Sequence, residues 1–250
     1  MKLSLRHLLW IWVLTPPIVV VVTELNKCIL IWNFRIVDFV DLVLMAPFYL
    51  IILLTITATV FKEKRTGGLF WLAIAMIGVF MYGHAMHLTG NAINTFATEV
   101  HNYRPQIPDN VYSLIYFLDE DLGHWLIYMS LFILIGIWGW MKIDPIPFHW
   151  TDALVGIIFG GTYAIAIIES SQPWLSFVAS AWLLFVLFKK ISWRFSLFSA
   201  NWKSDFFWRF LLLTALAVVV VEIVYAIVMG GFVQPSQLWE SNALNTISVT

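Results

Sequence analysis

The sequence predicts an all-α membrane protein, a bundle of seven transmembrane helices in a single domain over residues 1–250. Three observations lead to this fold class. First, 61% of the residues are hydrophobic and only 12% are charged, which is more apolar surface than a soluble domain of this size needs. Second, several segments are apolar over roughly 20 residues, the length that crosses a bilayer. Third, most of the basic residues fall in every second connection between these segments, which places them on one side of a membrane.

The expected spans follow from the length of each apolar segment. The first carries Pro16 and Pro17, which a membrane helix tolerates where neighbouring helices satisfy the freed backbone groups. Lys2 and Arg6 before an apolar run resemble a secretory signal, but no small-residue cleavage site follows, so we expect an uncleaved first helix. No repeat of the kind found in many transporters is visible. In chain order the spans are 8–26, 37–61, 69–94, 112–141, 152–169, 174–191 and 207–231.

The distribution of charge predicts the orientation. With the N-terminus in the cytoplasm and the C-terminus outside, 11 of the 14 Lys and Arg residues fall on the inner side. Only Lys27, Arg35 and Arg104 then lie outside, which is a strong positive-inside bias. We therefore expect a multi-pass protein of the cell membrane. The inner basic residues are Lys2, Arg6, Lys62, Lys64, Arg65, Lys142, Lys189, Lys190, Arg194, Lys203 and Arg209.

The overall balance of charge and cysteine excludes several classes of function. A net charge of −1 argues against a nucleic-acid partner. Cys28 is the only cysteine, which excludes an internal disulfide, a thiolate metal cluster and a covalent CxxCH haem site. Membrane lipid is the partner that the composition predicts, and the sequence leaves the oligomeric state open.

Ionisable residues cluster where the third span ends and the fourth begins. His84 and His87 lie three residues apart on one helix face, and Glu120, Asp121 and His124 fall within about 100° of arc on the next helix. Because consecutive spans are antiparallel, we expect these groups to face one another near the outer surface. Ionisable residues inside spans are costly and indicate a functional site.

Some acidic residues are expected to lie outside this cluster. At 100° per residue Asp119 points away, and we expect its carboxylate to interact with the helix start, where the dipole is positive. Asp38 and Asp41, like Glu24, are expected at the membrane interface. Gly156 and Gly160 form a GxxxG motif, which lets a membrane helix approach its neighbour closely.

Imidazole nitrogens with carboxylate oxygens are ligands for a divalent transition metal ion, Zn²⁺, Fe²⁺ or Mn²⁺. The Asp121-x-x-His124 spacing resembles the Glu-x-x-His element of di-iron helical bundles. Glu120, Asp121 and Glu222 are the candidate catalytic acids and bases. The candidate metal ligands are His84, His87, Glu120, Asp121, His124 and Glu169.

Seven helices with intramembrane His and Asp resemble in architecture the membrane metallohydrolases that include alkaline ceramidases and progestin/adiponectin receptors. Those proteins take a histidine pair from the last helix, where this chain has Glu222 and no histidine, so we assign no family.

These observations favour a metal-dependent enzyme, a hydrolase or an oxidoreductase, that acts on a lipid-like substrate near the outer leaflet. Bound metal would activate water, and a nearby carboxylate would take its proton. One alternative is a proton-coupled transporter or relay, which needs a polar path to the cytoplasmic side. Another is a non-catalytic subunit that binds haem between His84 or His87 and His124. The same groups could also form a hydrogen-bonded network that only holds the helices together.

Overall fold

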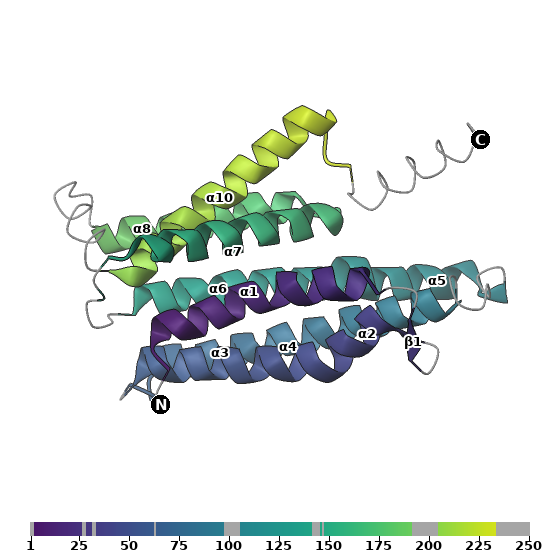
Figure 1. The fold of residues 1–250 in the computed structure, drawn as a ribbon, viewed down its shortest axis with the longest axis horizontal. Coiled ribbons are helices and arrows are strands. Elements are labelled where there is room, and N and C mark those ends of the chain that lie inside the picture. Colours follow the sequence, from purple (N-terminus) through teal and green to yellow (C-terminus); the bar gives the residue numbers. More distant parts are fainter. Residues whose placement is uncertain are drawn as a thin grey trace. The chain divides into compact units, whose positions relative to one another are not determined.

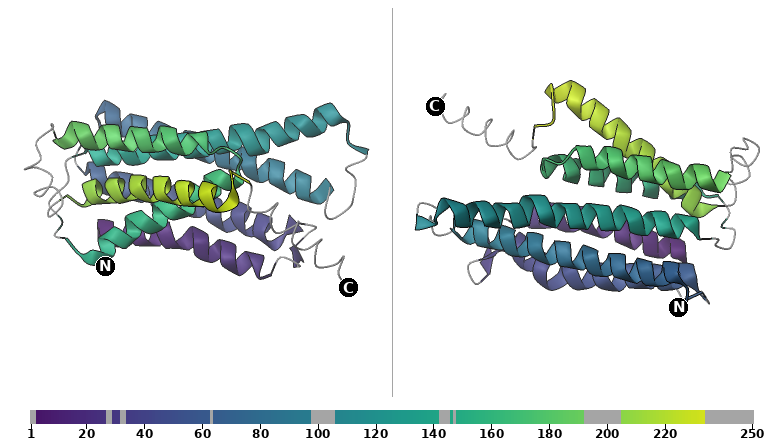
Figure 2. Two further views of the ribbon diagram at one scale, coloured as in Figure 1. Left: turned by 90° about the horizontal axis from the view of Figure 1, so that it is seen from above. Right: turned by 180° about the vertical axis from the view of Figure 1, so that it is seen from behind.

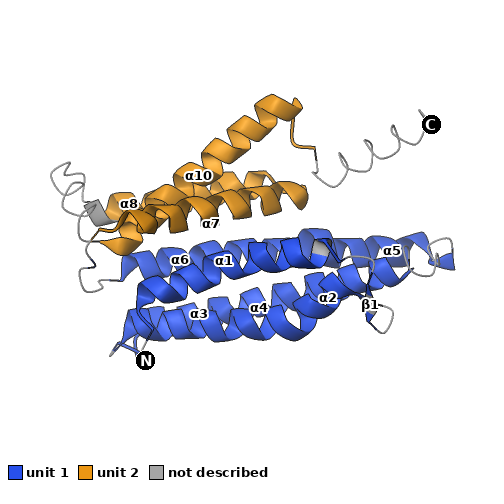
Figure 3. Ribbon diagram, in the orientation of Figure 1, with its two compact units in different colours: residues 1–146 blue, residues 147–250 orange. Residues whose placement is uncertain are grey.

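The structure is a computed structural model, and it describes residues 3–26, 29–31, 34–62, 64–97, 106–141, 146, 148–191 and 205–233. The chain forms two compact units, Met1–Ile146 and Pro147–Thr250 (Figure 3). A single domain over residues 1–250 stays a prediction, and each unit has its own core.

In the described residues of unit 1 the regular structure is helical except for one short hairpin, in which strands β1 and β2 pair antiparallel. Helix α4 lies alongside α6 and α3, and α3 lies alongside α1, as Figure 1 and the two further views of Figure 2 show. The elements are α1 (Leu5–Glu24), β1 (Leu30–Ile31), β2 (Phe34–Arg35), α2 (Ile36–Val40), the π-helical η1 (Asp41–Met45), α3 (Ala46–Phe61), α4 (Gly68–Thr95), α5 (Asp109–Tyr116), the π-helical η4 (Phe117–Gly123) and α6 (His124–Trp140).

Two of the expected spans each consist of three consecutive helical segments. α2, η1 and α3 run on without a break from Ile36 to Phe61, and α5, η4 and α6 do so from Asp109 to Trp140. A π turn inserts one more residue per turn than an α turn and changes the direction of the side chains after it. Both π segments therefore alter the helix faces that a regular α-helix would present.

Unit 2 consists of three helices in the described part of the chain: α7 (Trp150–Glu169), α8 (Trp174–Ile191) and α10 (Phe206–Met229). The starts of α7 and α10 carry polar side chains that accept backbone N–H groups. His149 and Asp152 form a capping box at α7, and Asp205 caps α10 by accepting the N–H of Trp208 at 3.0 Å. Such caps satisfy donors that have no partner inside the helix.

Six helices within the described residues are long and apolar enough to cross a membrane. They correspond to six of the seven predicted spans, and the remaining one is a shorter apolar helix over Trp174–Lys189. Many of their apolar side chains face outward: Ile51 is 65% exposed, Ile227 75% and Val228 72%. Exposed faces of this kind fit a lipid environment. The structure thus supports an all-α, multi-pass membrane protein, while the count of seven and the orientation stay predictions.

The core of unit 1 contains tightly packed aromatic residues. Trp138 is fully buried, donates its Nε1–H to Thr57 Oγ1 at 3.1 Å, and meets the ring of Trp12 edge to face with centroids 5.7 Å apart. An indole N–H buried among apolar helices needs such a partner. This contact joins α1, α3 and α6 well away from the ionisable residues.

The GxxxG motif of α7 lies against α10, as its small residues predict. A Cβ atom at Gly160 would lie 2.5 Å from the carbonyl oxygen of Thr214 and 2.8 Å from Cβ of Ala217. A Cβ atom at the adjacent Gly161 would meet nothing closer than 3.9 Å. Only one glycine of this neighbouring pair is therefore required by packing.

We expect Gly160→Ala to lower the free energy of unfolding by about 1–3 kcal/mol, because the added methyl group forces α7 and α10 apart. Gly161→Ala is the matched control, and its higher helix propensity should leave stability unchanged or raise it by up to ~1 kcal/mol. Reversible unfolding in mixed micelles, followed by circular dichroism, measures both. Equal losses in the two variants would contradict the packing described here.

Candidate histidine–carboxylate site

The predicted facing of the two polar segments is found in unit 1, with α4 on one side and η4 with the start of α6 on the other. The Nδ1 atom of His87 lies 2.6 Å from Oδ1 of Asp119. The carboxylate is buried, with 4% of the residue exposed. This hydrogen bond joins two spans and gives the buried carboxylate and the partly buried imidazole a partner.

The expected direction of Asp119 was wrong. A rotation of 100° per residue, which directs Asp119 away from the site, holds for an α-helix. Residues 117–123 instead form the π-helical η4, so the count fails in this segment, and Asp119 faces α4. π segments inside α-helices are frequent at functional sites.

Glycines permit the close approach of the two helices at this level. A Cβ atom at Gly90 would lie 2.5 Å from Cβ of Asp119, and one at Gly123 would lie 3.1 Å from the backbone nitrogen of His87. One glycine belongs to α4 and the other ends η4. Without larger side chains between them, the backbones come close enough for the short His87–Asp119 bond.

His124, the first residue of α6, is held by its own helix. Its Nδ1 atom lies 2.8 Å from the carbonyl oxygen of Glu120 and 3.5 Å from the Glu120 carboxylate. Because a carbonyl oxygen only accepts hydrogen bonds, Nδ1 of His124 carries the hydrogen, which leaves Nε2 with its lone pair in the neutral ring. The ring also stacks on Tyr128 with an interplanar angle of 7°.

The rings of His87 and His124 lie against each other, with centroids 4.4 Å apart and an interplanar angle of 45°. Each ring is held at Nδ1, His87 by the carboxylate of Asp119 and His124 by the carbonyl oxygen of Glu120. In metal sites such an outer partner orients the imidazole and leaves its other nitrogen for the metal. The two histidines from neighbouring spans share this feature.

His84 lies one turn from His87 and is 8% exposed. Its ring meets Tyr49 edge to face at 5.2 Å and stacks near Phe80 at 5.9 Å. Within the described residues its Nε2 atom is buried and has no hydrogen-bond partner. A buried polar atom without a partner is costly, and it suggests a ligand or water at that position.

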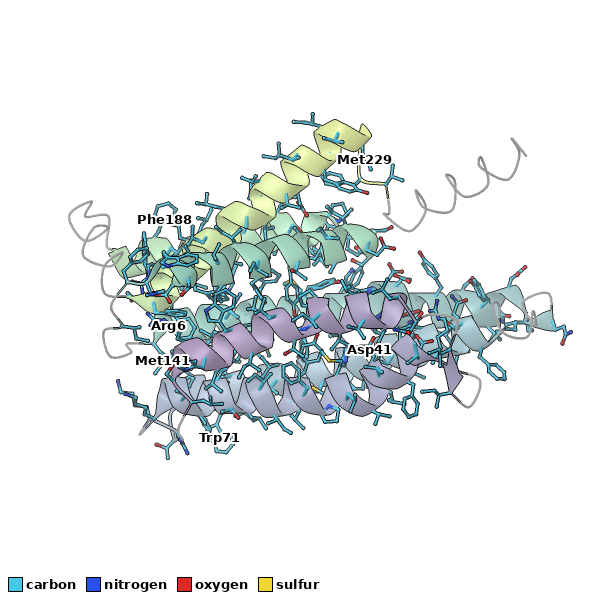
Figure 4. All side chains as sticks on the ribbon, viewed as in Figure 1. Arg6, Asp41, Trp71, Met141, Phe188 and Met229 are labelled. Atoms are coloured by element: carbon cyan, nitrogen blue, oxygen red, sulfur yellow. The ribbon has the colours of Figure 1, made fainter. Side chains whose placement is uncertain are left out.

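Asp38 and Asp41, expected at the interface, extend the site instead. Asp38 is 4% exposed, accepts a hydrogen bond from Asn91 Nδ2 at 2.9 Å, and pairs with Arg35 Nε at 3.4 Å. Asp41, at the start of η1 (Figure 4), lies close enough to His87 to interact with it electrostatically. The sequence held one signal for this: Asn91 shares the face of His84 and His87 and needs a polar partner.

The other predicted site residues are less central in the structure. The Glu120 side chain is 30% exposed and approaches His124, as described above. Asp121 is partly exposed and lies close enough to Tyr116 to interact with it electrostatically. Glu169 and Glu222 belong to unit 2, so their participation in this site stays a prediction.

In the described part of the chain, no three or more His, Cys, Asp or Glu side chains are grouped as ligands of one metal ion. The chain matches no family model, curated protein or solved structure. The chemistry of the site is accordingly argued from its own geometry.

Cavities border the site on two sides. A small polar cavity of about 50 Å³ reaches Asp119 and Glu120 and is lined also by Asn94, Tyr112 and Tyr116. A larger open groove of about 540 Å³ lies between α2–η1 and α4, with Asp38 among otherwise mostly apolar residues. The first is large enough for water, and the second resembles the apolar clefts that bind organic ligands.

We expect Asp119→Ala to reduce the free energy of unfolding by about 1–3 kcal/mol, because it leaves Nδ1 of His87 without its buried partner. Asp121→Ala, two residues along the same segment and partly exposed, should change it by no more than about 0.5 kcal/mol. Thermal unfolding of the purified proteins in detergent provides the comparison. A larger loss of stability for Asp121→Ala than for Asp119→Ala would contradict the π-helical geometry and favour a regular α-helix in this segment.

Proposed function

We propose that this multi-pass membrane protein binds a divalent transition metal ion, Zn²⁺, Fe²⁺ or Mn²⁺, through His87 and His124. The observation that carries the proposal is that Nδ1 of each ring is held, at 2.6 and 2.8 Å, by an oxygen of Asp119 and of Glu120. This leaves the Nε2 atoms of two adjacent rings as ligands. His84 and the carboxylates of Glu120 and Asp121 are the proposed further ligands, through side-chain rotation.

The distance between the rings supports a metal ion over haem. Two histidines at adjacent positions of one ion have ring centroids roughly 4.5–5 Å apart, since each metal–nitrogen bond is about 2 Å long. Histidines on opposite sides of a haem iron require roughly 6 Å or more. The 4.4 Å between the His87 and His124 rings is close to the first value and too short for the second.

The proposed reaction is hydrolysis or oxidation of a lipid-like substrate from the outer leaflet of the cell membrane. A bound divalent ion would activate water for hydrolysis, or support oxidation if it is redox-active. Glu120, partly exposed at the small polar cavity, is positioned to take a proton. The groove along α2, η1 and α4 offers an apolar surface for the substrate chain, with Asp38 as its polar residue.

A proton relay through the same groups is the second candidate. It is favoured by the sequence of contacts from Asp119 to His87, to His124 and to Glu120. Toward the other end of α4, however, the buried residues are Ala73, Ile77 and Phe80. A relay across the membrane needs polar groups there, so the metal site is the better supported of the two.

We expect purified wild-type protein, prepared without chelator and equilibrated with Zn²⁺, Mn²⁺ or anaerobic Fe²⁺, to retain about one ion per chain. His87→Ala and His124→Ala should each lower the affinity at least tenfold, since each removes a ligand. His7→Ala is the control, because His7 is exposed near the N-terminus and contacts Ser4. Elemental analysis after gel filtration measures the bound metal.

A wild-type protein that stays empty in all three metals would contradict the metal site and leave the relay as the better reading. Equal retention by His87→Ala, His124→Ala and His7→Ala would show that any bound metal lies elsewhere.

Ala92→Trp should fill the apolar groove, because Ala92 lines it on α4. We expect this variant to lose at least three-quarters of the lipid or detergent molecules that the wild-type protein retains in native mass spectrometry. Ala75→Trp, on the exposed face of the same helix but outside the groove, is the control. Equal retention in the two tryptophan variants would indicate only general contact with lipid.

A further inference from the structure

A second polar group lies in unit 2, independent of the histidines. Glu222 is on α10 and is 1% exposed. Ser176 and Ser180, one turn apart on α8, are 1% and 4% exposed. Within the described residues, Oε1 of Glu222 and the Oγ atoms of both serines have no hydrogen-bond partner, although the Glu222 carboxylate interacts with the nearby Ser176 hydroxyl.

The buried carboxyl group of Glu222 differs from the other buried charges of the unit, which pair with each other. Arg209 and Asp152, both fully buried side chains, pair at 3.1 Å, and the guanidinium also lies over the rings of Phe148 and Phe206. Glu222 has no cationic side chain interacting with it in the described chain. A buried charge without a counter-charge is expensive, so the carboxylate requires a positive charge from outside the chain.

The surroundings of Glu222 contribute no such charge. The ionisable groups of the three helices that form its unit are few, and the basic ones lie toward the opposite end from Glu222. In full, those of the described residues are Asp152, Tyr163 and Glu169 on α7, Lys189 and Lys190 on α8, and Arg209 and Tyr225 on α10.

The position of Glu222 suggests how a small ion reaches it. Seven residues separate it from Met229, the end of α10, which is about 10 Å along the helix. Tyr225 lies between them and interacts electrostatically with Glu169, the last residue of α7. In Figure 1 this end of α10 diverges from α7 and α8. Toward the other end, the buried residues Val218 and Ala215 are apolar.

We infer that Glu222, Ser176 and Ser180 form a binding site for one small monovalent cation, open toward the Glu169 end of unit 2. The ligand is Na⁺ or a proton, since either places a single positive charge on the carboxyl group. Hydroxyl and carboxylate oxygens suit both: they coordinate hard cations, and they share a proton in a hydrogen bond. This inference does not depend on the metal site of unit 1.

The test measures thermal unfolding of the purified full-length protein as the concentration of each cation is varied. In one series Na⁺ replaces N-methylglucamine at constant ionic strength and pH. In the other, pH is varied without Na⁺. A cation that binds only the folded protein raises its Tm, by roughly 5 °C at a hundredfold excess over Kd. We expect wild-type protein to respond in one series and Glu222→Gln to lose that response.

Asp109→Asn is the matched control and should respond as wild type does, because Asp109 is an exposed acid at the start of α5 in unit 1. Ser176→Ala and Ser180→Ala keep the carboxyl group and should each shift the midpoint of the response about tenfold in cation concentration. These two variants keep the test decisive if Glu222→Gln fails to fold.

The two series also distinguish the ligands. A Na⁺ response that is absent from Glu222→Gln identifies a sodium site, and a difference confined to the pH series identifies a protonation site. The inference is overturned if wild type responds in neither series, or if both serine variants and Glu222→Gln respond as wild type does.

Discussion

The hydrogen bond between His87 and Asp119 is the interaction on which the described site depends. Asp119 is buried and His87 is partly buried between apolar helices, so removing either one leaves the other without its partner at a cost in free energy. At 2.6 Å the bond links α4 to η4 across a gap that Gly90 and Gly123 keep narrow. It also fixes the orientation of the His87 ring, and hence its contact with His124. Local helix geometry, helix packing and site chemistry therefore meet in one contact.

The spans themselves could be predicted from the sequence because they depend on composition. A helix that lies in lipid must be apolar along its whole length, and this property is visible without knowledge of any contact. Six expected spans correspond to membrane-length helices, and the remaining one, 174–191, coincides with α8, in which the apolar helix Trp174–Lys189 is below that length. The facing of His87 and His124 could also be predicted, because consecutive spans are antiparallel and the polar groups lie where one span ends and the next begins.

The side chains that complete the site could not be predicted because they depend on departures from regular geometry. Asp119 faces α4 only because η4 is π-helical, and no residue type in that segment marks a π turn. Asp41 begins the other π segment and lies near His87, far from it in sequence. Asp38 resembles any interfacial acid until its bond to Asn91 is seen. Long-range partners of this kind are invisible to a periodicity argument.

The hydrogen bonding of the buried polar atoms bears on the choice between a ligand site and a purely structural network. A network that only held the helices together would gain most by satisfying every buried polar atom, since partial satisfaction is worse than an apolar core. Here Nδ1 of His87 and of His124 is satisfied, while the buried Nε2 atom of His84, one turn from His87 on α4, has no hydrogen-bond partner among the described residues. Two rings that are each held at one nitrogen, beside a third histidine with an unsatisfied nitrogen, are better explained by our proposal of a ligand than by packing. Glu222 differs in this respect from Arg209 and Asp152 of unit 2, whose opposite charges pair with each other at 3.1 Å. In both units the proposals of a ligand rest on unsatisfied polar groups rather than on the mere presence of charge.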